Sequence, residues 1–235
     1  MTPDLPGYVS PVFILTVFLT VGIFLYALVK AGIKSLPAVF LLGFVLCWIA
    51  VQAILASLGF FQNFDVVPPR TFAFGPLPFF LLTFAYLILF RKFLAKLPLA
   101  ALTILHVIRI PIELVLFWLY QNGEIPVEMT FEGRNFDILS GITAPIIYFL
   151  AFRNGAVNRP LLIAWNIAAL ALLANIVTIA ILAFPSPFQM IGFGQPNIGV
   201  TRFPFIWLPA VVVPIVFFCH VVSLWRLLSN TNVGE

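Results

Sequence analysis

Long apolar stretches separated by short polar ones dominate the pattern of the chain. A helix needs about 20 mostly apolar residues to cross a bilayer, because the hydrocarbon core is about 30 Å thick and each residue rises about 1.5 Å. The pattern predicts seven transmembrane helices, at about 8–30, 37–60, 74–93, 99–121, 136–152, 160–184 and 205–228. The fifth stretch is the shortest and contains Pro145, so a re-entrant segment there would leave six spans.

The composition supports a membrane protein rather than a soluble one. Of the 235 residues, 63% are hydrophobic and only 9% are charged. Soluble domains carry about 25% charged residues, and a soluble fold of this size could not hide so much apolar surface. No polar stretch is long enough for a second domain. We therefore expect one all-α integral membrane domain over residues 1–235, with the lipid bilayer as its main partner.

The distribution of Lys and Arg predicts the orientation. The connections after the first, third and fifth predicted helices, with the C-terminal end, hold eight of them: Lys30, Lys34, Arg91, Lys92, Lys96, Arg153, Arg159 and Arg226. The opposite side holds Arg70, Arg134 and Arg202. The positive-inside rule then predicts an outer N-terminus and a cytoplasmic C-terminus, in a multi-pass protein of a bacterial-type plasma (inner) membrane. It also explains the net charge of +4 without nucleic acid as a partner.

The predicted outer connections, at 61–73, 122–135 and 185–204, are longer than the inner ones. They are rich in Pro, Gly and aromatic residues, whereas disordered loops avoid aromatics. We expect an ordered outer cap that could bind a protein partner. A plain belt of aromatic residues at the membrane interface is the alternative interpretation.

The most informative polar residues lie in the fourth predicted helix. His106, Arg109 and Glu113 are spaced i, i+3 and i+7, so they share one helix face. Ionisable residues inside a membrane are costly unless paired, which makes this face a candidate site within the bundle. Arg109 and Glu113 are four residues apart, and we expect them to form an ion pair with further partners from the last three helices. A buried pair that only fixes helix packing is the alternative.

A second group of charges precedes the fifth predicted helix. Asp137 could cap that helix, because carboxylates are favoured at helix N-termini. Glu132 and Arg134 could close a lid over the mouth of the bundle, and the Arg109 site would then be reached beneath residues 128–137. The alternative is a solvated acidic loop.

His220, in the seventh predicted helix, lies at a depth similar to that of His106. The two could meet across the bundle, which raises a bis-histidine haem or a metal held through His106 and His220 as an alternative. Neither histidine belongs to a ligand-spacing motif, so no metal site is predicted, and a hydrogen-bonded packing role is the ordinary interpretation. Cys47 and Cys219 lie in apolar runs and indicate no disulfide.

Several known classes do not fit. Seven helices with an outer N-terminus resemble the architecture of rhodopsins and G-protein-coupled receptors, but the last span has no Lys for a retinal Schiff base. The D-R-Y and N-P-x-x-Y receptor motifs are missing from the sequence. Ceramidase-like zinc hydrolases need three histidines, and this chain has two. Since no hydrolase, zinc-protease or phosphate-binding motif occurs either, an enzyme is not predicted.

Three functions remain open. The first is the binding or translocation of a small solute or proton through His106, Arg109 and Glu113, with Glu132, Arg134, Asp137 and His220 as further binding residues. The second is a membrane-embedded sensor or structural subunit that uses its ordered outer loops. The third is a membrane haem or metal protein.

Overall fold

The fold is a bundle of membrane-length helices. The structure, a computed structural model, describes residues 5–153 and 156–229, and it contains no β-strand in those ranges. Six helical segments are long and apolar enough to cross a membrane: Val9–Gly32, Leu36–Ser57, Arg70–Leu89, Leu99–Gln121, Arg159–Leu182 and Leu208–Leu228. A seventh apolar helix, Ile138–Ala151, is shorter. The molecule is thus an all-helical bundle whose main helices can span a bilayer.

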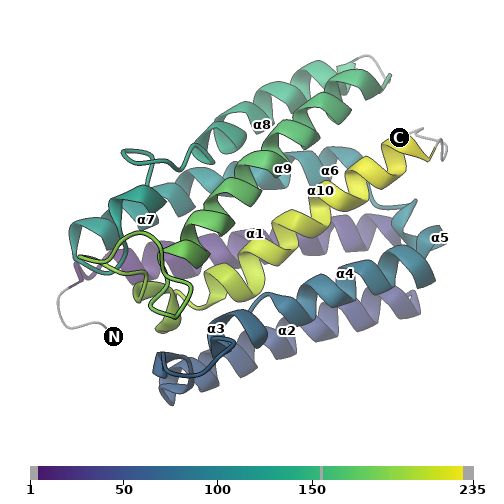
Figure 1. Cartoon of the computed structure of the whole chain (residues 1–235). Helices are drawn as coiled ribbons and strands as arrows, with labels where there is room; N and C mark the ends of the chain where they lie inside the picture. The colour runs from purple at the N-terminus through teal and green to yellow at the C-terminus, as the bar shows by residue number, and fades with distance from the viewer. Residues whose placement is uncertain (1–4, 154–155, 230–235) are drawn as a thin grey trace.

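The helices lie roughly along one direction (Figure 1). Most are unbroken, but three of the long segments consist of shorter pieces. The principal elements are α1 (Val9–Gly32), α2 (Leu36–Ser57), α3 (Arg70–Ala73), α4 (Leu77–Leu89), α5 (Arg91–Leu94), α6 (Leu99–Ile104), the 3-10 turn η2 (Leu105–Ile108), α7 (Arg109–Gln121), α8 (Ile138–Ala151), α9 (Arg159–Leu182), the π-helical stretch η6 (Leu208–Val212) and α10 (Val213–Leu228).

Prolines account for the interruptions. Pro111 has no N–H to donate, and the turn before it tightens from α to 3-10 geometry in η2. Pro214 likewise cannot bond the carbonyl of Ala210, and that carbonyl accepts the indole N–H of Trp48 at 3.1 Å instead. A neighbouring helix therefore satisfies the backbone group that the proline leaves free, as a membrane interior requires.

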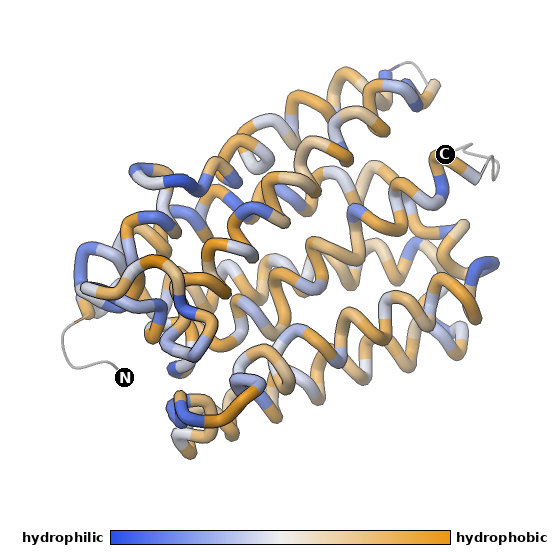
Figure 2. The backbone as a smooth tube through the Cα atoms, in the orientation of Figure 1, coloured by the Kyte–Doolittle hydropathy of each residue, from blue (hydrophilic) through white to orange (hydrophobic). Residues whose placement is uncertain are grey.

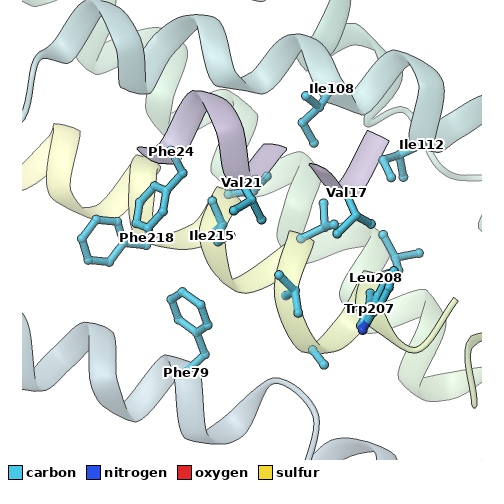
Figure 3. Close-up of a cluster of buried hydrophobic side chains, with 14 of the residues drawn as sticks. Val17, Val21, Phe24, Phe79, Ile108, Ile112, Trp207, Leu208, Ile215 and Phe218 are labelled. Atoms are coloured by element: carbon cyan, nitrogen blue, oxygen red, sulfur yellow. The ribbon is translucent and has the colours of Figure 1, made fainter. Parts of the chain in front are cut away.

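The core lies between α1, the α6–α7 segment and α10. Phe24 of α1 meets Phe218 of α10 edge to face at 5.5 Å between ring centroids. Figure 3 shows these rings beside Phe79 of α4 and, further along, Ile108 and Ile112. By contrast, few residues of α2 and α4 are buried, and many of their apolar side chains are exposed, so they present their outer faces to lipid.

Polar residues gather at the two ends and in the connections, while the tube is mostly hydrophobic along the helices (Figure 2). At the end where α1 begins, the segments 122–137 and 183–207 are joined by hydrogen bonds. The carbonyl of Glu124 accepts the N–H groups of Ile198 and Gly199, at 3.2 and 2.8 Å. The side chain of Glu124 also forms an ion pair of 2.7 Å with Arg202. These two segments are thus ordered against one another.

Helix α8, which corresponds to the fifth apolar stretch of the sequence, differs from its predicted form. The fifth apolar stretch was expected to span the bilayer at 136–152, whereas α8 has 14 residues and a length of about 21 Å. Figure 1 shows it starting partway along its neighbour α9. Its length falls short of the hydrocarbon core of about 30 Å.

Candidate functional site

Arg109 is the centre of a buried polar cluster. It lies near the midpoint of the continuous 99–121 segment, and only 2% of its surface is exposed. Its Nη1 donates to Asp137 Oδ1 at 2.6 Å and to the carbonyl of Ala169 at 3.2 Å. Its Nη2 lies 2.8 Å from His220 Nε2. The partners come from α9, α10 and the start of α8, so this one guanidinium joins four segments of the bundle.

The partner of Arg109 is not the one expected from the sequence. An ion pair with Glu113 was predicted from their i, i+4 spacing, and that prediction is wrong: Arg109 pairs with Asp137. The predicted capping role of Asp137 is wrong for the same reason. Asp137 stands at the N-cap position of α8 but makes no side-chain cap hydrogen bond, because its carboxylate turns to Arg109.

The hydrogen bonds around His220 define its tautomer. An arginine can only donate, so His220 Nε2 must be the acceptor and carries no proton. His220 Nδ1 then donates to Asn166 Oδ1 at 2.8 Å, and Asn166 Nδ2 donates to the carbonyl of Leu162 at 2.8 Å. Each of these three hydrogen bonds, from Arg109 to His220, from His220 to Asn166 and from Asn166 to Leu162, pairs one donor with one acceptor. The imidazole is therefore held neutral and fixed in position.

His106 meets His220 in a different way. The two rings stack at 3.9 Å between centroids with 20° between their planes, and Trp165 packs edge-on against His106 at 5.3 Å. Neither ring nitrogen of His106 has a hydrogen-bond partner among the described residues, and the side chain is fully buried. His106 thus contributes packing rather than hydrogen bonding.

The stacked geometry does not fit haem or metal ligation by His106 and His220. Two axial ligands direct their in-plane nitrogen lone pairs at one metal ion, whereas these rings face each other flat. Both nitrogens of His220 are already engaged with Arg109 and Asn166. Within residues 5–153 and 156–229, no group of three or more His, Cys, Asp or Glu side chains could hold a metal ion.

Asp137 reaches Arg109 because the chain turns back into the bundle after α7. From Arg109 to the end of α7 the helix rises about 18 Å. The following segment, 122–137, returns over that distance and ends beside Arg109. Gly141, one turn into α8, packs on the same level: a Cβ there would lie 2.9 Å from Ile110 Cγ1 and 3.0 Å from the Ile110 nitrogen. A glycine is needed for this close approach of two helices.

Glu113 lies one turn beyond Arg109, toward the end where α1 begins, and has a separate partner. Both of its carboxylate oxygens lie 2.7 Å from Asn135 Nδ2, which also donates to the carbonyl of Met129 at 3.0 Å. Glu113 is only 1% exposed. In the part of the chain that the structure describes, no Lys, Arg or His lies within ion-pair distance of it. This carboxylate therefore stands buried with an amide, and no cation, beside it.

Asn135 and Asn166 are residues that the sequence reasoning missed. Asn135 anchors Glu113 and also accepts the backbone N–H of Asp137 at 3.0 Å, which forms the turn into α8. An Asn two residues before a predicted helix start is the available signal for such a turn. Asn166 forms a hydrogen bond between α9 and α10, and through it orients the ring of His220.

Glu132 and Arg134 do not join the cluster. Both side chains are exposed on segment 122–137. The carbonyl of Arg134 accepts Asn175 Nδ2 at 2.8 Å, which ties the segment to α9. The structure thus brings together His106, Arg109, Asp137 and His220, with Glu113 one turn away, and leaves the two remaining candidates at the surface.

A cavity of about 370 Å³ lies next to Glu113. Glu113 and Asp137 are the two ionisable residues that line it, and almost all the other lining side chains are apolar. The apolar lining comes from α3 and α4, from α7, from α9 and from η6 with the start of α10. It includes Phe72, Leu77 and Phe80; Ile112 and Leu116; Leu173, Ile176 and Ala180; and Leu208 and Val213. The site is an apolar chamber with two carboxylates in its wall.

Comparison with known proteins gives one match. A family described as Domain of unknown function (DUF8737) matches residues 67–228, a range that holds Arg109, Glu113, Asp137, His220 and every residue that lines the cavity. Comparison with curated proteins found no match, and comparison with solved structures found none either. Because the matched range covers more than half of the chain, the protein belongs to the DUF8737 family.

Proposed function

We propose that the bundle has seven transmembrane elements, with α8 as a shortened seventh that starts inside the membrane. Segment 122–137 takes the place of its missing outer part. Irregular backbone at this depth is tolerated where protein buries it or where it borders a cavity, and residues of this segment meet both conditions. Discontinuous helices of this kind are found at the binding sites of transporters. The test is cysteine accessibility from each side of sealed vesicles.

The Lys and Arg distribution supports an outer N-terminus. Lys30, Lys34, Arg91, Lys92 and Lys96 lie where α1 meets α2 and where α4 leads into α6. That end would face the cytoplasm of a cell with this protein in its plasma membrane. The opposite end, with the hydrogen-bonded segments 122–137 and 183–207, would face outward.

For the activity, we propose that the protein binds a small, largely apolar molecule in the cavity beside Glu113. The observation that carries this proposal is the cavity itself. It opens toward the surface beside Leu77 and Ile181, and its volume of about 370 Å³ is in the range of small-molecule sites. Its apolar wall with a few polar groups is the usual composition of a small-molecule site.

Binding is favoured over passage across the membrane. The cavity lining ends at the level of Asp137, where the Arg109 cluster closes the bundle with paired side chains. Below it His106 and His220 stack against each other and against Trp165. A solute that entered from the outer half would meet this closed layer.

The test uses a neutral probe, a dodecanol that carries a photoreactive diazirine. In purified protein in nanodiscs, labelling should map to α4, α9 and the start of α10. Ala180→Trp and Val177→Trp, which place bulk in the cavity, should reduce labelling at these sites. Ala171→Trp is the matched control, because Ala171 is exposed on the opposite face of α9. Equal labelling of Ala180→Trp and Ala171→Trp proteins would refute binding in the cavity.

A further inference from the structure

The charges around the cavity do not balance. Arg109 and Asp137 form an ion pair and cancel. His220 is neutral because it accepts a hydrogen bond from Arg109, and His106 has no acceptor among the described residues for a second N–H. Glu113, when ionised, therefore leaves one negative charge in excess. In a membrane interior an unpaired carboxylate is costly, so either a proton or a cation must neutralise it.

Among the described residues that line the cavity there is no Lys or Arg, so a cation beside Glu113 would have to belong to a ligand. The side chains that line it from α3, α4, α9 and η6 are uncharged, as are the lining residues Asn197 and Val200 of the outer segment. The charged groups near Glu113 are Arg109 and Asp137, and these already pair with each other. Asn135 offers one amide nitrogen to a carboxylate that can accept about four hydrogen bonds. Glu113 thus keeps acceptor capacity, and its side chain lines the chamber.

The apolar lining of the cavity indicates the chemistry and size of the rest of the ligand. A volume of about 370 Å³ is large enough for a small organic molecule. An alkyl or aromatic body of that size would fill the chamber beyond the carboxylate. An anionic head is disfavoured, because it would meet Glu113 and Asp137 with only the already paired Arg109 to offset them.

The cavity also has a route to lipid. Leu77 of α4 and Ile181 of α9 both line it, and they are 47% and 38% exposed. Both belong to segments apolar enough to cross the membrane, so their exposed surfaces would face lipid. A molecule dissolved in the bilayer can therefore reach the chamber between α4 and α9 without passing through water.

We propose that the occupant is a single-chain amphiphilic amine, which enters from the bilayer between α4 and α9 and pairs its ammonium group with Glu113. This inference rests on the binding function proposed above and adds the chemical class and the entry route. It commits the site to a positively charged head, and a neutral acyl chain is the outcome that the experiment must distinguish from it.

The experiment compares three probes with the same chain: dodecylammonium, dodecanol and dodecanoate. Equilibrium binding to the full-length protein in phosphatidylcholine nanodiscs is measured against empty nanodiscs as background. We expect dodecylammonium to bind about tenfold or more tightly than dodecanol, and dodecanoate to bind most weakly, since tenfold corresponds to about 1.4 kcal/mol for the ion pair. In Glu113→Gln the preference for ammonium should vanish, so that dodecylammonium and dodecanol bind within about threefold of each other.

Two controls separate the possible failures. Glu132→Gln removes the same charge from an exposed position and should leave the preference intact. Ala180→Trp should weaken dodecylammonium binding even though Glu113 is present. If dodecanol binds as tightly as dodecylammonium and Ala180→Trp weakens both, the cavity binds apolar molecules but the amine inference is wrong. If none of the probes binds above background, the proposed function fails with it.

Discussion

Two carboxylates line one cavity, and they have different partners. Asp137 has a cation: it meets Arg109 at 2.6 Å in a cluster whose other contacts come from α9 and α10. Glu113 has an amide, Asn135, and no cation among the described residues. The difference separates structure from function in this bundle. An ion pair between two helical segments holds the bundle together, whereas a buried carboxylate without a cation beside a chamber can bind a ligand.

The largest effect is expected where pairing is broken. Asp137→Ala should lower the free energy of unfolding by about 3–5 kcal/mol, because it leaves a buried guanidinium without its counter-ion. The double variant Arg109→Met with Asp137→Leu should lose much less, because no charge is stranded. Unfolding in detergent, followed by loss of helical circular dichroism, measures both. A double variant less stable than Asp137→Ala would contradict the description of this pair.

The two stacked histidines should also differ. His220→Phe removes the acceptor for Arg109 and the donor to Asn166, so we expect a loss of about 1.5–3 kcal/mol of unfolding free energy. His106→Phe keeps an aromatic ring in the stack and removes no hydrogen bond, so its change should stay below about 1 kcal/mol. The same unfolding assay compares them, and equal losses would mean that the hydrogen bonds of His220 do not stabilise the bundle.

A smaller loss of stability is expected when the close contact between Gly141 of α8 and Ile110 of α7 is disturbed. Gly141→Ala places a methyl group 2.9 Å from Ile110 Cγ1 and 3.0 Å from a backbone nitrogen, so α8 must shift from Arg109 and the expected loss is about 1–2 kcal/mol. Gly22→Ala, within α1, is the matched control because a Cβ there meets nothing within 4 Å. It should be neutral or slightly stabilising. Equal stability of the two variants would show that α8 does not depend on this close approach.

Much of the fold could be predicted from hydropathy, because lipid imposes a minimum length of apolar helix. Residues 8–30 were predicted as a span, and Val9–Gly32 is observed. The fifth span was predicted too long, because apolar residues at 136–152 look alike whether they start at the interface or inside the bundle. The position of α8 in the bundle is fixed by the contact of Gly141 with Ile110 and by the ion pair of Asp137 with Arg109. Both are tertiary contacts that no local pattern encodes.

The burial of the polar face at 106–113 was predicted correctly, whereas the pairing of its charges was not. Helical spacing puts His106, Arg109 and Glu113 on one face, and the structure buries all three. The same spacing favoured Glu113 as the partner of Arg109, since it counts only neighbours on one helix. Asp137 lies 28 residues further along the chain and arrives because segment 122–137 turns back into the bundle. The uncharged residues that complete the site, Asn135 and Asn166, give no signal strong enough to single them out.

The most direct measurement is the stability of two charge-neutralising variants of similar shape, Glu113→Gln and Asp137→Asn. Both carboxylates are buried beside the same cavity, and each variant removes one negative charge. If Asp137 alone is the counter-ion of Arg109, Asp137→Asn should cost about 2–3 kcal/mol of unfolding free energy, and Glu113→Gln less than about 1 kcal/mol. A loss for Glu113→Gln as large as that for Asp137→Asn would show that Glu113 holds the bundle together, and would remove the basis for a ligand at that carboxylate.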